Sequence, residues 1–188
     1  MLGLKVFRKE PAAKVVRAFL DQVVQTVGRA PRHCVTDRGP QFDCPCFEEG
    51  WCAGHGVKPR FGAIGRHGSI AIIERFIRSL KGEWLRRLFL VPLRRRELEA
   101  ELALWAAWYN GHRPHRALGG RTPDEVYFDR PPANEQPRFE PRPAYPRQGH
   151  CAGPPAKVKG RRGVRLELDA KFLEGRKHLP VVRLRPVA

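Results

Sequence analysis

The hydrophobic pattern of the first thirty residues changes period at Pro11. Before it, Leu2 to Phe7 alternate loosely between apolar and polar side chains, which predicts a β-strand. After it, apolar residues recur at helical spacing until Gly28, which predicts a helix with a broad face toward the core. The residues of that face are Val15, Val16, Phe19, Leu20, Val23, Val24 and Val27.

Strand-like and helix-like segments alternate over the next eighty residues. The short apolar run His33 to Thr36 predicts a buried strand that delivers Asp37, and Val57 to Phe61 predicts another strand. Between them, FEEGWCAGHG suggests a helix closed by glycine. Two longer stripes predict helices from Ser69 to about Leu88 and from Arg95 to Asn110. Their apolar residues are Ile73, Ile77, Leu80 and Trp84 in the first, and Leu98, Leu102, Trp105 and Tyr109 in the second. This order of elements predicts an α/β layer fold.

Proline marks a change of character near residue 130. The segment 131–156 is so rich in proline that an extended linker is the better interpretation. Beyond it, Val164, Leu166 and Leu168 alternate with charged residues, and PVVRLRPV predicts a second strand. We therefore expect three parts: a core over 1–130, a linker over 131–156 and a small β-rich module over 157–188.

Charge narrows the classes of partner. The 188 residues include 36 Lys and Arg against 19 Asp and Glu, a formal net charge of +17, which favours a polyanion such as nucleic acid. No apolar run approaches the roughly 18 residues that span a bilayer, so no membrane partner is expected. The N-terminus lacks the apolar core of a signal peptide, which indicates an intracellular, cytoplasmic protein.

The five cysteines do not suggest a disulfide framework, because their number is odd and no export signal accompanies them. Cys44, Cys46, Cys52 and His55 could in principle bind zinc. Their spacing matches no standard ligand pattern of structural zinc sites, so buried free thiols are the preferred interpretation.

Two carboxylates have a plain and a functional interpretation. Asp37, in VTDRGPQF, is either a turn residue or a carboxylate held at the end of a strand for chemistry. Glu74 lies beside the apolar stripe of its predicted helix, with Arg78 and Lys81 on the same face. It either forms an ordinary ion pair with Arg78 or binds a metal between two cations that face phosphates.

Three segments in the right order favour the functional interpretation. TDRGPQF, RHGSIAIIERFIRSLKGE and WYNGHRPHRALGGRTPDEVYF resemble the retroviral-type integrase core of bacterial insertion-sequence transposases, the DDE family with a ribonuclease-H-like fold. The 36 residues between Asp37 and Glu74 are close to the usual spacing in that family. The resemblance covers roughly residues 2–128, and the basic β-rich module resembles the tails of such proteins only in general character.

The resemblance implies site residues. Asp37 would be the second acid of the catalytic triad and Glu74 the third, both as metal ligands. Arg78 and Lys81 match positions that contact the DNA end in the family, and His67 belongs to the glycine-containing loop before that helix, Gly65 to Gly68. For the segment from Tyr109 to His115 we expect packing and helix termination first and direct DNA contact second.

The resemblance also implies a cofactor and partners. Phosphoryl transfer of this kind uses two Mg²⁺ or Mn²⁺ ions about 3.5–4 Å apart, and carboxylate oxygens are their natural ligands. The two-metal site is expected only in the complete protein. The expected partner is double-stranded DNA, both element ends and target, and self-association into a homo-oligomer is an open expectation. In the tail, nonspecific contacts to phosphates are expected from Lys157, Lys159, Arg161, Arg162 and Arg165.

The sequence departs from the family at its start. The first aspartate of the triad lies on a strand upstream of the one that Leu2 to Phe7 match, so the core is expected to lack its first strands and the chain to be an inactive fragment. The alternative is a non-catalytic basic DNA-binding protein that retains the integrase fold. An unrelated RNA-binding protein would explain the charge but not the three motifs.

Overall fold

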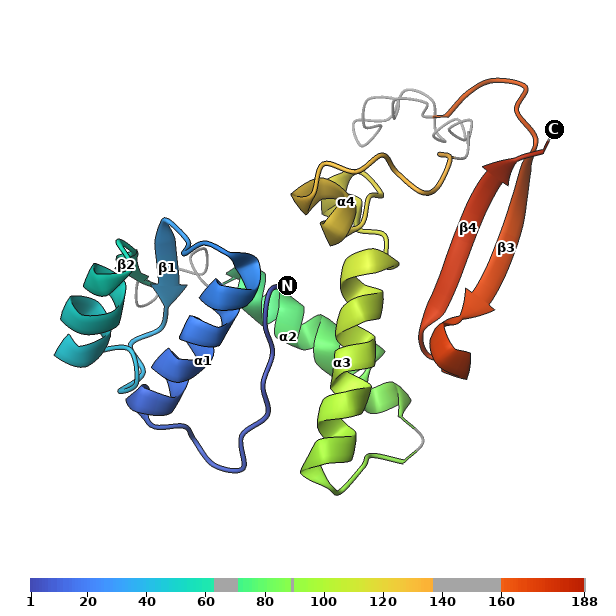
Figure 1. Cartoon of the computed structure of the whole chain (residues 1–188). Helices are drawn as coiled ribbons and strands as arrows, with labels where there is room; N and C mark the ends of the chain where they lie inside the picture. The colour runs from blue at the N-terminus through green and yellow to red at the C-terminus, as the bar shows by residue number, and fades with distance from the viewer. Residues whose placement is uncertain (63–70, 89, 137–159, 188) are drawn as a thin grey trace, which may run out of the picture. The chain divides into compact units, whose positions relative to one another are not determined.

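The structure is a computed structural model, which describes residues 1–62, 71–88, 90–136 and 160–187 (Figure 1). It divides into two compact units, Met1–Ala103 and Leu104–Ala188. The first holds α1 (Ala13–Val27), β1 (His33–Thr36), the π-helix η1 (Cys46–Cys52), β2 (Lys58–Phe61), α2 (Ala71–Glu83), η2 (Leu85–Arg87) and the start of α3 (Arg95–Gly111). The second holds the end of α3, η3 (Arg116–Leu118), α4 (Pro123–Tyr127), β3 (Leu166–Phe172), η4 (Leu173–Gly175) and β4 (Pro180–Pro186).

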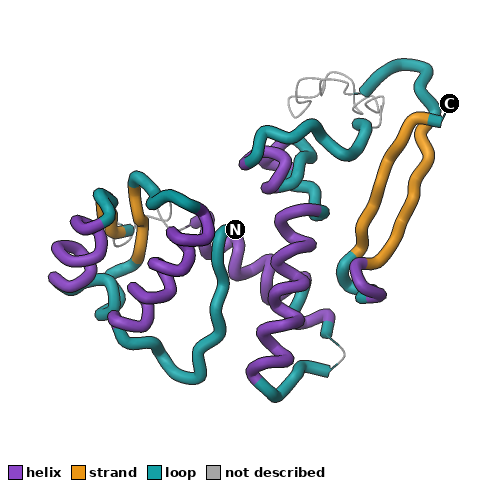
Figure 2. The backbone as a smooth tube through the Cα atoms, in the orientation of Figure 1, coloured by secondary structure: helices purple, strands orange, loops and turns teal. Residues whose placement is uncertain are grey.

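The two strands of the first unit lie parallel. Their register pairs His33 with Lys58 and Thr36 with Phe61, and the amide of Gly62 donates to the Thr36 carbonyl at 2.9 Å. Figure 2 shows both strands beside α1 and η1. The strand was predicted to be buried, but Val35 is 51% exposed. Parallel strands become fully buried when other layers cover both faces, and among the described residues this pair has no third strand.

The core of the first unit is built around η1. Phe47 and Cys52 are fully buried, and Phe47 stacks on Trp51 with ring centroids 5.9 Å apart. Partly buried residues of α1, of β1 and of the loop between β1 and η1 pack against this cluster, among them Leu20, Val24, Cys34 and Phe42. The apolar face predicted for α1 therefore does reach a core, and Gly28 ends the helix in a left-handed conformation with φ of 79°.

The strand predicted for Leu2 to Phe7 is wrong. These residues form no strand, and the chain instead runs close to α1. A Cβ at Gly3 would lie only 2.5 Å from Val23 Cγ2, so the backbone passes directly against that helix. The Lys5 ammonium lies 6.0 Å from the centre of the Phe19 ring. An alternating pattern of apolar and polar side chains is not sufficient for a strand, because a strand also needs a neighbouring strand with which to pair.

Helix α2 forms where its periodicity predicted, but its apolar stripe is not covered by the described residues. Ile73 is 51% exposed and Ile77 is 41% exposed, whereas Trp84 just after the helix is buried. Periodicity identifies an amphipathic helix without identifying the surface that it packs against.

The second unit joins the end of α3 to an antiparallel hairpin. Strands β3 and β4 pair from Leu166 with Pro186 to Phe172 with Pro180. The Trp108 indole donates to the Pro180 carbonyl at 2.7 Å, and Leu179 is fully buried beside it in sequence. The β-rich module predicted from the alternation is therefore a hairpin held to a helix.

A polar cluster fixes the chain after α3. Thr122 caps α4, with its hydroxyl accepting from the Glu125 amide at 3.3 Å and its own amide donating to the Glu125 carboxylate at 2.8 Å. The second carboxylate oxygen of Glu125 accepts from the Ala133 amide at 2.7 Å. The Arg121 guanidinium donates to the carbonyls of Glu125 and Arg130. The buried Glu125 carboxylate thus joins the residue that caps the start of α4 to the chain that leaves the helix.

The predicted α/β class is confirmed, since helices pack with a parallel strand pair in the first unit and with a hairpin in the second. Within the described ranges, no helix is long and apolar enough to cross a membrane. Along the chain, the boundary between the two compact units falls after Ala103, whereas the sequence suggested functional parts that end near 130 and 156. Those functional boundaries stay predictions.

Candidate metal and nucleic-acid site

Asp37 lies directly after the carboxyl end of β1 and is exposed. Its Oδ1 accepts from the Gly39 amide at 3.2 Å, so the residue does form the local turn expected of Asp-X-Gly. The adjacent Arg38 pairs with Asp43 at 3.6 Å and lies 5.2 Å from the Phe61 ring centre. Because Arg38 turns to these two partners, no described cation neutralises Asp37. The turn is compatible with a role as a metal ligand, because Asp37 Oδ2 has no partner among the described residues.

Glu74 occupies the first turn of α2 and is exposed, as are Arg78 and Lys81. The ion pair between Glu74 and Arg78 of the plain interpretation does not form: among the described residues the Glu74 carboxylate has no ion pair or side-chain hydrogen bond. The helix thus exposes the Glu74 carboxylate, which has no partner among the described residues, together with the cations Arg75, Arg78 and Lys81.

The donor chemistry of Asp37 and Glu74 fits a hard divalent cation. Both offer carboxylate oxygens that no described Lys or Arg occupies, which is the ligand type that Mg²⁺ prefers. Among the described residues, no three His, Cys, Asp or Glu side chains come together as a metal site. The sharing of an ion by Asp37 and Glu74 stays a prediction, and residues 63–70, which connect β2 to α2, lie outside the described ranges.

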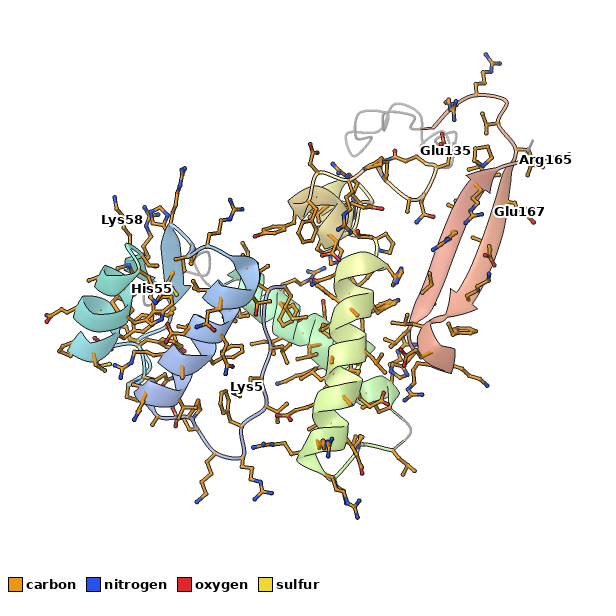
Figure 3. The ribbon with its side chains drawn as sticks, in the orientation of Figure 1. Lys5, His55, Lys58, Glu135, Arg165 and Glu167 are labelled. Atoms are coloured by element: carbon orange, nitrogen blue, oxygen red, sulfur yellow. The ribbon has the colours of Figure 1, made fainter. Side chains whose placement is uncertain are left out.

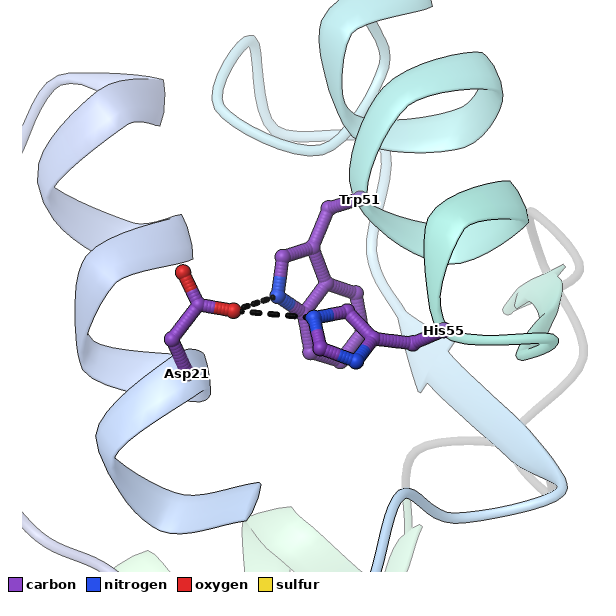
Figure 4. A network of polar contacts seen from close by, with 3 residues as sticks. All are labelled: Asp21, Trp51 and His55. Carbon is purple, nitrogen blue, oxygen red and sulfur yellow. Dashed lines mark hydrogen bonds and ion pairs between the residues drawn. The ribbon is translucent and has the colours of Figure 1, made fainter. Parts of the chain in front are cut away.

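Asp21 has a role that the sequence did not indicate. It lies on the polar side of α1, yet its Oδ1 accepts from the Trp51 indole at 2.7 Å and contacts His55 Nε2 at 3.0 Å (Figure 4). Trp51 and His55 stand one turn apart, with ring centroids separated by 4.9 Å. The only available signal was the spacing of Trp51 and His55, which did not identify their partner. Asp21 therefore joins α1 to η1 and supports the strand pair that ends at Asp37.

Replacing Asp21 with Ala is expected to lower the free energy of opening of α1 and η1 by about 1–2 kcal/mol, because the buried Trp51 indole loses its charged acceptor. Asp21→Asn should cost less, since an amide oxygen can still accept. Hydrogen exchange of the α1 and η1 amides measures the change. Asp43→Ala is the matched control, as it removes only the exposed pair with Arg38. Equal losses for Asp21→Ala and Asp43→Ala would contradict the assignment.

The predicted tail residues are only partly within the described ranges. Lys157, Lys159 and, upstream, His67 lie outside them. Arg161 pairs with Glu135 at 3.1 Å, whereas Arg162 and Arg165 are exposed and have no described acidic partner. Figure 3 shows Arg165 at the start of β3, beside the end of the chain.

One face of the hairpin sets opposite charges across from each other on its two strands. Its register sets Glu167 opposite Arg185 and Asp169 opposite Arg183, and Lys171 also pairs with Asp169 at 3.5 Å. Arg162 and Arg165, in the segment that leads into β3, add positive charge that no described acidic residue pairs with.

The segment after α3 packs as expected. Arg113 lies 5.5 Å from the Tyr109 ring centre, and the Tyr109 and His115 rings meet edge to face at 4.8 Å. The amides of His112 and Arg113 both donate to the Trp108 carbonyl and end the helix. Packing and helix termination account for these residues, and direct DNA contact from them stays a prediction.

Comparison with known proteins links this arrangement to a family. Residues 55–123 match the model of the integrase core domain family. An uncharacterized 31.7 kDa protein of insertion element IS407 from Burkholderia multivorans is 30% identical over 95 residues, 50% of this chain and 33% of that protein. The chain thus spans about a third of the length of this curated relative.

Two solved structures are also similar. The catalytic core domain of BIV integrase has a TM-score of 0.49 and 26% identity, covering 64% of this chain and 74% of that one. A chain of a simian T-cell lymphotropic virus intasome in complex with the PP2A regulatory subunit B56 gamma has a TM-score of 0.49 and 14% identity, covering 95% and 55%. The family match contains Glu74, Arg78 and Lys81, while Asp37 precedes it. The resemblance expected from the motifs is therefore confirmed: over residues 55–123 the chain is similar to the integrase core domain family.

Proposed function

We propose that the chain acts in DNA integration or transposition, as the part of an integrase-type transposase that binds duplex DNA and contributes Asp37 and Glu74 to metal-dependent strand cleavage and strand transfer. The observation that carries this proposal is the integrase-core match over 55–123, which contains Glu74 with its two neighbouring cations. The uncommitted carboxylate oxygens of Asp37 and Glu74 support it.

Each side chain has a distinct task in this proposal. Asp37 and Glu74 would hold Mg²⁺ or Mn²⁺, which when bound stabilises charge on the transferring phosphate. The turn made by Gly39 fixes one oxygen of Asp37 and leaves the other for the ion. Arg78 and Lys81, one and two turns further along α2 than Glu74, would contact phosphates of the DNA end.

A non-catalytic DNA-binding role is the second candidate. The net charge of +17 favours phosphate binding whether or not a metal is held, as do Arg162 and Arg165, which have no acidic partner in the part of the chain that the structure describes. The two candidates differ in one property, because only the first requires Asp37 and Glu74 to bind divalent cations.

Titration of the full chain with Mn²⁺ tests the first candidate. The electron paramagnetic resonance signal of the free ion measures how much Mn²⁺ is bound. Asp37→Asn or Glu74→Gln is expected to weaken binding by about tenfold or more, since each removes an anionic ligand. Asp43→Asn is the control: it removes a nearby carboxylate that already pairs with Arg38, and should leave Mn²⁺ affinity unchanged.

The same variants separate the candidates in DNA binding. Because Asp37→Asn and Glu74→Gln each remove a negative charge, neither should weaken binding to duplex DNA without metal. Mn²⁺ affinity equal in wild type, both variants and the Asp43 control would reject the metal role and leave the non-catalytic function.

A further inference from the structure

Two cysteine sulfurs lie unusually close together in the loop between Asp37 and η1. Cys44 Sγ and Cys46 Sγ are 2.7 Å apart, with only Pro45 between them in sequence. A disulfide has its sulfurs about 2.05 Å apart, so bonding them would need a movement of roughly 0.7 Å. The loop therefore already holds both thiols near the geometry of a covalent bond.

Cys46 is the most exposed of the described cysteines. Cys46 is exposed and Cys44 is half-buried, whereas Cys52 is fully buried in the core beneath Phe47 and Trp51. Cys34 is half-buried in β1 and packs against that same core. A small oxidant can thus reach Cys46 without opening the fold.

The surroundings favour a thiolate on Cys46. The hydrogen bond from the Cys44 thiol lowers the pKa of Cys46, and nearby Arg17 lowers it further against an opposing contribution from partial desolvation. Arg17 is held there because its Nη1 donates to the Cys46 carbonyl at 2.8 Å. Burial instead raises the pKa of Cys34 and of Cys52. Since thiolates are the reacting form, Cys46 is the preferred nucleophile of the four.

We propose that Cys44 and Cys46 form a reversible thiol–disulfide site that hydrogen peroxide oxidises. The proposal rests on the distance between the sulfurs, their exposure and the position of Arg17. It is independent of the integrase-type function and of any bound metal.

The reaction balances with one peroxide. The Cys46 thiolate attacks a peroxide oxygen, the O–O bond breaks, and hydroxide leaves to become water with a proton from solution, giving a sulfenic acid. Cys44 then attacks the Cys46 sulfur, the S–OH bond breaks, and the hydroxyl leaves as water with the Cys44 proton. Two thiols lose two electrons, one peroxide gains them, and two waters form. A thiol reductant such as dithiothreitol reverses the step, as is typical of exposed disulfides.

Peptide mapping of the full chain tests the proposal. The reduced protein is treated with one equivalent of hydrogen peroxide, alkylated and digested with trypsin. Cleavage after Lys and Arg leaves Cys34 in peptide 33–38, Cys151 in 148–157, and Cys44, Cys46 and Cys52 together in 39–60. Peptide 39–60 is expected to lose about 2 Da before alkylation and to take up one alkyl group, on Cys52, instead of three. Dithiothreitol should restore all three.

Single variants assign the roles. Cys44→Ser should stop the reaction at a sulfenic acid on Cys46 that dimedone traps, whereas Cys46→Ser should abolish both dimedone labelling and the disulfide. Cys151→Ser is the matched control and should leave the oxidation of peptide 39–60 unchanged. Alkyl groups on Cys44 and Cys46 after peroxide treatment, or a disulfide joining Cys34 to Cys52, would overturn the proposal.

Discussion

Raising the salt concentration from 50 to 200 mM is expected to weaken the binding of this chain to duplex DNA by about 500-fold. If the tail neutralises roughly five phosphates, log affinity should fall with log salt with a slope of about −4.5, because each released counterion contributes about −0.9. The residues proposed to do this are Lys157, Lys159, Arg161, Arg162 and Arg165. Fluorescence anisotropy with a labelled duplex, repeated at several salt concentrations, measures the slope.

Matched variants test where this charge acts. Arg165→Gln is expected to reduce the steepness of the slope by about 0.9, since Arg165 has no described acidic partner. Lys171→Gln is the control within the same hairpin and should change the slope less, because Lys171 already pairs with Asp169. A salt-independent affinity, or equal effects of the two substitutions, would contradict the proposed interface.

Replacing Phe47 with Ala is expected to lower the free energy of unfolding of the first unit by about 3–5 kcal/mol. Phe47 is fully buried, stacks on Trp51 and meets the edge of Phe42 at 5.3 Å, so its loss leaves a cavity where η1 joins the loop after β1. Hydrogen exchange of the η1 and β1 amides against urea measures the change.

Phe172→Ala provides the comparison for this substitution. Phe172 is the same residue type but 50% exposed on the hairpin, so its replacement should cost well under half as much. Protection of the η1 amides that survives Phe47→Ala unchanged would show that the cluster is not the centre of this unit.

The sequence predicted those elements whose local signals agree with their surroundings. Helix α1 has an apolar face, a clear terminating glycine at position 28 and a core to receive the face. A β-rich module was predicted from the alternation at Val164, Leu166 and Leu168, and the structure shows that its two strands, β3 and β4, pair as a hairpin. Asp37 was placed correctly at the end of a strand because the apolar run stops there and turn residues follow.

The remaining features depend on contacts between distant residues. Leu2 to Phe7 alternate but follow α1 closely at Gly3, and no strand of the described residues pairs with them. Asp21 looks like a solvent-facing helix residue until Trp51 and His55 are folded beside it. The sequence likewise could not show that the Glu74 carboxylate has no ion pair among the described residues, because an i,i+4 spacing to Arg78 permits an ion pair without requiring one.

The hairpin is fastened at both sides of the proline-rich segment. Before that segment, the Glu135 amide donates to the Leu184 carbonyl at 3.0 Å, and Asn134 Oδ1 accepts from the Leu184 amide at 2.8 Å. The Arg161 pair with Glu135 and the Trp108 bond to Pro180 add to the same attachment. The covalent path through 137–159 is therefore not what keeps the hairpin in place. A chain cleaved by a protease between residues 137 and 159 is expected to elute from gel filtration as one species, because the two fragments stay associated noncovalently.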